Sequence, residues 1–161
     1  MGGGHDVLLR ALLADAPEAT GVLFDLPEVI AGAADSLADR PRHERPIQAV
    51  GGSFFDSGPD DGDLYLLAHV LHDWDDGPAA KILRNCHRSG QPGHTLAVVE
   101  FLLPAQSDYW LPFLLDLHML VTNGGRERTA DDFRSLLTGA DYQLERIINL
   151  PGGQNILLAR A

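Results

Sequence analysis

Apolar residues along the chain follow two different spacings, which predict a series of strands and helices. Short unbroken apolar runs bounded by glycine, proline or acidic residues indicate buried strands, whereas apolar residues three and four apart indicate helices with one buried face. The predicted strands cover residues 21–25, 47–50, 64–67, 95–103, 142–150 and 155–159. The predicted helices cover residues 7–13, 28–37 and 112–121, with one more beginning near Asp76 and another after Thr129.

Several residues mark where these elements begin or turn. Asp75 offers an N-cap with Pro78 in the first turn that follows, and Thr129 with Asp132 forms a capping-box pattern. A Pro-Gly-Gly turn at residues 151–153 joins the last two strands as a hairpin. Strands that alternate with helices predict an α/β fold with a mostly parallel sheet, to which the hairpin adds an antiparallel edge.

Composition and charge narrow the class of protein. A chain of 161 residues is expected to form one domain. The formal net charge of -11 and the lack of a Lys/Arg cluster argue against nucleic acid and anionic membranes as partners. Cys86 is the only cysteine, which excludes an internal disulfide. We see no apolar run of membrane-spanning length and no signal peptide, and therefore expect a cytoplasmic protein.

A glycine run at residues 2–4 precedes the first predicted helix, and Asp25 ends the next strand about 20 residues later. Glycines before a helix let a ligand approach the backbone, and an acidic residue at this distance typically binds ribose hydroxyls. The alternative is a frayed chain start, with Asp25 capping the helix after Pro27. The pattern does not distinguish a dinucleotide from S-adenosylmethionine.

Five further blocks, in a fixed order after the glycines, carry a family resemblance. They are VLFDLPEVI at 22–30, VGGSFF at 50–55, LLAHVLHDWDD at 66–76, VVEFLLP at 98–104 and NGGRERT at 123–129. The chain resembles the S-adenosylmethionine-dependent O-methyltransferases of the plant caffeate and flavonoid type and their bacterial polyketide-tailoring relatives. The resemblance implies a Rossmann-like methyltransferase sheet with helices on both faces, and transfer of a methyl group to a hydroxyl of a small phenolic or polyketide-like acceptor.

His72 follows a strand end, where α/β sheets place their ligands, and is similar to the family's catalytic base. A phenol is a poor nucleophile until a base such as imidazole removes its proton. Glu100 and Glu127 match the acidic positions that flank this histidine in the family, although the polar surroundings of Glu127 would by themselves indicate a solvated side chain. His69, His72 and Asp73 would suit a metal, but the family is metal-independent, and we therefore expect no metal.

The resemblance also assigns residues around these three. It places Gly2, Gly4, Asp25, Leu26, Ser53 and Phe54 at the cofactor, although Phe54 would also suit a core. It places Trp74, Asp116 and Met119 at the acceptor, together with Phe113 and Leu120. A plain amphipathic core helix at 112–121 would have the same pattern, and Trp74 would also suit a core or a cleft wall.

The chain departs from the family pattern in several ways. The family's first strand, which carries an acidic residue, would end where Met1 stands, and we therefore expect this strand to be missing. In the family's fold it lies at the centre of the sheet. Asp6 replaces the last glycine of the loop, Ser53 replaces an aspartate and Ala68 replaces a lysine of plant members. Nothing corresponds to the helical N-terminal domain through which full-length relatives form homodimers.

Three hypotheses follow from these observations. The chain is the catalytic part, residues 1–161, of an O-methyltransferase, or it is a truncated remnant without catalytic activity. The third hypothesis, a nicotinamide-dependent oxidoreductase, is the weakest, because the negative charge of Asp6 opposes a pyrophosphate.

Overall fold

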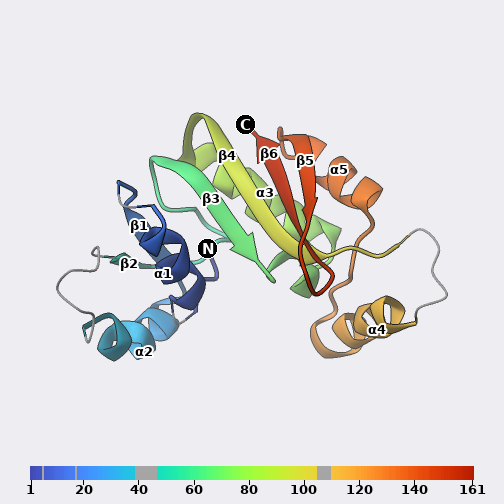
Figure 1. Ribbon diagram of the computed structural model, residues 1–161, viewed down its shortest axis with the longest axis horizontal. Helices are drawn as coiled ribbons and strands as arrows, with labels where there is room; N and C mark the ends of the chain where they lie inside the picture. Colours follow the sequence, from blue (N-terminus) through green and yellow to red (C-terminus); the bar gives the residue numbers. More distant parts are fainter. Residues whose placement is uncertain (5, 17, 39–46, 105–109) are drawn as a thin grey trace.

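The computed structural model describes residues 1–4, 6–16, 18–38, 47–104 and 110–161, whose strands form two separate sheets (Figure 1). In the smaller sheet, β1 (Gly21–Asp25) and β2 (Ile47–Gly51) pair in parallel. In the larger sheet the order is β3-β4-β6-β5, formed by β3 (Gly62–Ala68), β4 (Gly90–Phe101), β5 (Gln143–Asn149) and β6 (Gln154–Arg160). β3 and β4 are parallel, whereas β6 is antiparallel to both of its neighbours. The predicted strands and the antiparallel C-terminal pair are therefore confirmed.

The helices also begin where the sequence signals them. They are α1 (Val7–Ala14), α2 (Pro27–Ala38), the 3-10 helix η1 (Leu71–Asp73), α3 (Asp76–Ser89), α4 (Leu111–Asn123) and α5 (Ala130–Thr138). Asp75 accepts a hydrogen bond from the Asp76 N–H at the start of α3, and Thr129 and Asp132 form both halves of the capping box of α5. Gly124 ends α4 with a φ of 69°, a left-handed conformation that favours glycine.

One face of the larger sheet carries the main hydrophobic core. Leu67, Leu96, Val98 and Leu157 are fully buried on this face, where they belong to one cluster with α3 and α5 residues. Most of the side chains that alternate with them on the strands are only partly buried, with Ala97 a buried exception, and Figure 1 shows no helix over that other face among the described residues. The prediction of helices on both faces therefore does not hold for this sheet within the described part of the chain.

β4 begins earlier than the sequence pattern predicts, at Gly90 instead of Thr95. A register shift accounts for the difference, because Gly62 pairs with Gly90 whereas Leu64 pairs with Thr95. His94 fills the irregular stretch, with one ring nitrogen 2.8 Å from the Gln91 carbonyl and the other 2.6 Å from the Tyr142 hydroxyl. Glycine and proline in this stretch hide the strand from an apolar pattern.

β1 and β3 face each other across the space between the two sheets and do not pair. Residues 1–3 bridge them, because the Met1 amine donates to the Leu66 carbonyl at 2.7 Å and the Gly3 N–H donates to the Phe24 carbonyl at 3.3 Å. Burial lowers the pKa of the Met1 amine. Three residues can close only one end of this space, and among the described residues no ladder joins the rest of the two strand edges.

α4 stands apart from the other helices in Figure 1 and contacts mainly η1. Its described apolar side chains are largely exposed, from Phe113 at 46% to Val121 at 76%. A helix this apolar and this exposed favours association with another surface. No helix of the described residues is long and apolar enough to span a membrane.

We predict that the two sheets differ in local stability. A pair of strands is marginally stable by itself, and Leu23 and Phe24 of β1 lie outside the main core cluster. Amide hydrogens of β1 and β2 should therefore exchange with solvent at least tenfold faster than those in the middle of β4 and β6. Hydrogen–deuterium exchange read by mass spectrometry measures this, and equal protection of both sheets would show that they unfold as one unit.

Candidate active site

The buried carboxylate of Glu100 organises the ends of β3 and β4. One oxygen, Oε1, accepts the N–H groups of Val70 at 3.1 Å and Leu71 at 2.9 Å, which holds the turn that follows β3. The other oxygen, Oε2, lies 3.0 Å from Nδ1 of His72 and 3.8 Å from Nδ1 of His69. Glu100 is fully buried, and its carboxylate therefore sets both the backbone of the turn and the surroundings of His72.

His72 lies between acidic side chains on both sides of its ring. Nδ1 faces Glu100 and is 3.6 Å from Oε1 of Glu127, whereas Nε2 is 3.5 Å from Oδ1 of Asp73. The carboxylate of Glu100, followed by that of Glu127, raises the pKa of His72 to about 10, against the opposing effect of burial. The three side chains predicted as catalytic thus lie together, and Glu127 is buried at 4% exposure and not solvated.

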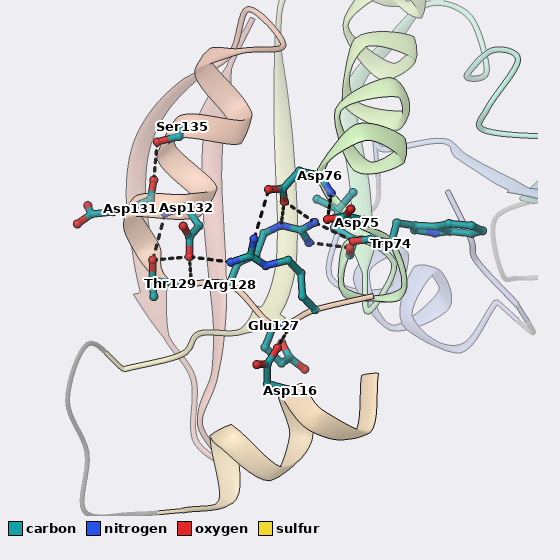
Figure 2. A network of polar contacts seen from close by, with 12 residues as sticks. Trp74, Asp75, Asp76, Asp116, Glu127, Arg128, Thr129, Asp131, Asp132 and Ser135 are labelled. Atoms are coloured by element: carbon teal, nitrogen blue, oxygen red, sulfur yellow. Dashed lines mark hydrogen bonds and ion pairs between the residues drawn. The ribbon is translucent and has the colours of Figure 1, made fainter. Parts of the chain in front are cut away.

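Segment 125–128 packs directly against the turn that carries His72. The Arg126 N–H donates to the His72 carbonyl at 2.9 Å. A Cβ at position 125 would lie 2.0 Å from that same carbonyl oxygen, so that only glycine fits there. The Glu127 N–H donates to Oδ1 of Asp116 at 2.9 Å, and Figure 2 shows this contact below the arginine network. The segment therefore fixes the position of Glu127 relative to His72.

Arg128 holds the same turn from its other side (Figure 2). Its guanidinium donates to the carbonyl of Leu71 at 2.8 Å, to the carbonyl of Trp74 at 2.7 Å and to Oδ1 of Asp76 at 3.0 Å. The two carbonyls lie on either side of His72 in the sequence, and the Arg128 side chain is fully buried. Sequence reasoning missed Arg128 and Gly125. Their place in the NGGRERT block was the only signal for them.

The residues predicted at the cofactor gather near the chain start. The Gly4 N–H donates to Oδ2 of Asp25 at 3.0 Å, which brings the glycine run and the acidic strand end together. Leu26, next to Asp25, donates its N–H to Oδ1 at 2.7 Å. Gly4 has a φ of 53°, and apart from its chain neighbours no described atom lies within 4 Å of the place where its Cβ would be. The loop therefore leaves open space at Gly4, the residue that binds Asp25.

Aromatic side chains lie on the other side of the glycine run. The Phe54 ring reaches within 3.9 Å of the Cβ position of Gly2. It contacts Phe55 and Trp74 edge to face, with ring centroids 5.0 Å and 6.1 Å away. Ser53 accepts the Phe55 N–H at 3.2 Å and shapes the turn. The sequence did not single out Phe55, which connects Phe54 to Trp74.

The residues predicted at the acceptor lie in three different surroundings. Trp74 packs partly against the main core, whereas Asp116 binds the Glu127 backbone and Met119 is partly buried on α4. Asp6, the residue that departs from the family's glycine pattern, is buried at 1% exposure. Neither of its carboxylate oxygens has a hydrogen-bond partner. The acidic side chain predicted near the cofactor is therefore buried, with no hydrogen-bond partner among the described residues.

The fold and these side chains define an α/β protein with a glycine loop, an acidic strand end and a histidine held between buried carboxylates. A family model described as "O-methyltransferase domain" matches residues 1–143, and the chain belongs to this family. A phenazine O-methyltransferase of Lysobacter antibioticus is 44% identical over 161 residues. The alignment covers 99% of this chain and 47% of that protein.

Solved structures agree with this assignment. LaPhzM has a TM-score of 0.93 at 42% identity, with 99% of this chain and 48% of that chain covered. Human N-acetylserotonin methyltransferase, solved in complex with S-adenosylmethionine, has a TM-score of 0.88 at 32% identity, with 99% and 46% covered. The chain thus spans about half the length of the relatives that it matches.

We predict that Arg128→Met destabilises the protein by about 2–5 kcal/mol, because it removes hydrogen bonds from a charged donor to the Leu71 and Trp74 carbonyls, each worth about 1.5–3 kcal/mol. Urea unfolding at neutral pH measures the change. The matched control is Arg134→Met, which removes an exposed ion pair with Asp131 and should cost less than about 1 kcal/mol. A similar small loss in both variants would mean that Arg128 does not hold the turn.

We also predict that Glu100→Gln lowers the pKa of His72 from about 10 toward its ordinary value. Because the folded pKa is raised, the stability that His72 contributes is complete below pH about 6.5 and is lost as the pH rises through about 10. Imidazole NMR titration in chelator-treated buffer measures the pKa. Glu127→Gln should lower it less, and an unchanged pKa in Glu100→Gln would contradict the assignment of Glu100 as the main cause.

Proposed function

We propose that the chain is the catalytic half of an S-adenosylmethionine-dependent O-methyltransferase. The acceptor would be a hydroxyl group on a small aromatic or polyketide-like molecule, with His72 as the general base. The observation that carries the proposal is the arrangement of His72, whose Nδ1 faces two buried carboxylates while Nε2 lies on the other side of the ring. The relatives named above support the acceptor class, because their names refer to a phenazine and to N-acetylserotonin.

The geometry of the glycine loop fits the proposed cofactor. Gly4 has open space where a side chain would be, and the Asp25 carboxylate can accept ribose hydroxyls because, among the described residues, each oxygen accepts one backbone N–H and keeps a further acceptor site. Leu26, Ser53 and Phe54 would line the adenosine. When bound, S-adenosylmethionine supplies an electrophilic methyl group on a positively charged sulfur.

The pKa of His72 suits proton transfer from a phenol. A phenolic hydroxyl such as that of tyrosine has a pKa of about 10, so that its proton moves to an imidazole of similar pKa at little cost. Glu100 stabilises the imidazolium formed when Nε2 takes the proton from the acceptor oxygen. At neutral pH the same state forms when the acceptor binds as a phenolate beside protonated His72. In both cases one proton is shared between the two groups.

A second candidate is a remnant that binds ligand without catalysis, which the separation of β1 from β3 favours. We expect the isolated chain to be nearly inactive, because none of the described residues beyond 1–3 pairs with the facing strand edges and α4 is exposed. A chimera in which the N-terminal half of the Lysobacter relative precedes this chain discriminates the two candidates. Methyl transfer by the chimera to phenolic acceptors, lost about 100-fold in its His72→Ala variant, would support the enzyme. A chimera that binds cofactor but transfers no methyl group would support the remnant.

We predict for that chimera that Asp25→Ala weakens binding of S-adenosylhomocysteine by about 1.5–3 kcal/mol, the range for hydrogen bonds to a charged group. Calorimetry measures the affinity, with Asp131→Ala as a control at an exposed carboxylate. NAD should not compete. Normal affinity in Asp25→Ala, or competition by NAD, would refute the proposed cofactor site.

A further inference from the structure

His69, His72 and Glu100 form a group that the proposed reaction only partly uses. One ligand atom from each side chain lies within 4.8 Å of the others, and this is the one such histidine and carboxylate group found among the described residues. The separations from Oε2 of Glu100 are 3.0 Å to His72 Nδ1 and 3.8 Å to His69 Nδ1. Two imidazoles and one carboxylate are a ligand set that divalent transition metals favour.

The buried atoms in this group are poorly satisfied by one another. Nδ1 of His72 and Oε2 of Glu100 are close, yet both lack a directed hydrogen-bond partner. In a hydrogen bond the donor N–H points at the acceptor atom. Two atoms that bind the same ion instead point their lone pairs at the ion. An ion about 2.1 Å from both Nδ1 and Oε2 could therefore bind them although they form no directed hydrogen bond with each other. Oε2 of Glu100 is an unpartnered, fully buried oxygen that faces this point.

The charge balance also favours a cation. Glu100 and Glu127 are both buried, at 0% and 4% exposure, and both lie beside His72. One imidazolium compensates only one of the two carboxylates, and Oε2 of Glu127 likewise has no hydrogen-bond partner. A divalent ion beside a neutral imidazole would compensate both.

The backbone holds His69 in position for this role. Its φ of 54° is in the left-handed region, which is uncommon for a residue other than glycine, and its N–H donates to the Val99 carbonyl at 3.0 Å. Nε2 of His69 lies 2.9 Å from the side-chain amide of Gln154. An amide can turn its nitrogen or its oxygen toward the ring, and can therefore pair with His69 whether Nδ1 carries a proton or a metal.

We propose that His69, His72 and Glu100 bind a divalent transition-metal ion of the Zn²⁺ class, and that this ion excludes His72 from acting as a base. A neutral imidazole that binds a metal through Nδ1 carries its proton on Nε2, which then has no lone pair for the acceptor's proton. The metal is thus inhibitory, which is compatible with a metal-independent reaction. The metal site does not depend on the proposed function, whereas the inhibition rests on it.

Titration of the untagged, chelator-stripped chain with Co²⁺ tests the site, because the visible absorption of Co²⁺ reports nitrogen ligands and does not require a monomer. We expect one equivalent to bind, to be displaced by Zn²⁺ and to resist excess Mg²⁺, which prefers oxygen ligands. His69→Asn should weaken binding at least tenfold. Asparagine is chosen because it tolerates the left-handed backbone at this position. His118→Gln, at an exposed histidine of α4, should leave the affinity unchanged.

Three results would overturn the proposal: no Co²⁺ spectrum up to millimolar metal, the same affinity in His69→Asn as in the parent chain, or an equal loss in His118→Gln. Circular dichroism of each variant confirms that it is folded. The consequence for catalysis is measured separately in the active chimera, where Zn²⁺ should inhibit methyl transfer and EDTA should restore it. If the ion binds but does not inhibit methyl transfer, the claim that the metal prevents His72 from acting as a base is wrong, whereas the metal site itself stands. Failure of the chimera to transfer methyl groups would leave the Co²⁺ result standing, because that measurement needs no turnover.

Discussion

The buried carboxylate of Glu100 is the interaction on which the rest of the site depends. A charged group without water must be compensated, and here two backbone N–H groups of the turn after β3 supply part of that compensation. The same bonds fix the position of the turn that carries His72. One side chain on β4 therefore sets both the position of the histidine and its pKa. Removal of the carboxylate would therefore free the turn at the same time as it lowered the pKa of His72.

The turn is held from its opposite side by segment 125–128, and the two attachments act on different groups. Glu100 binds N–H groups at its start, whereas Arg126 and Arg128 bind its carbonyls. A short 3-10 helix leaves both kinds of backbone group without internal partners, and burial makes external partners necessary. This explains why so polar a loop is buried in the protein: its arginine and amide donors complete the backbone of η1. The position of Glu127 beside His72 follows from that packing and from Asp116.

The sequence predicted the strands and the capped helices, and it assigned Gly4 and Asp25, which the structure brings together, to one cofactor site, because each depends on local pattern or on the ends of neighbouring strands. The roles of Arg128 and Gly125 could not be predicted in this way. They depend on carbonyl oxygens more than fifty residues away in the chain, and a carbonyl has no residue-specific signal. The burial of Glu127 was hidden for the same reason. The early start of β4 was missed because glycine and proline carry the irregular pairing there.

The acidic side chains of the site favour S-adenosylmethionine over a nicotinamide dinucleotide because the two cofactors carry opposite charges. Asp6, Glu100 and Glu127 are buried acids with unpartnered oxygens, and Asp25 lies at the open part of the glycine loop. A nicotinamide dinucleotide would bring a pyrophosphate, whose negative charges a low-dielectric surrounding of carboxylates repels. S-adenosylmethionine carries a positive sulfonium and an ammonium group. A site rich in acidic side chains would therefore favour S-adenosylmethionine over the dinucleotide. The same excess of buried negative charge around His72 makes a divalent ion a competitor for the place of the proton.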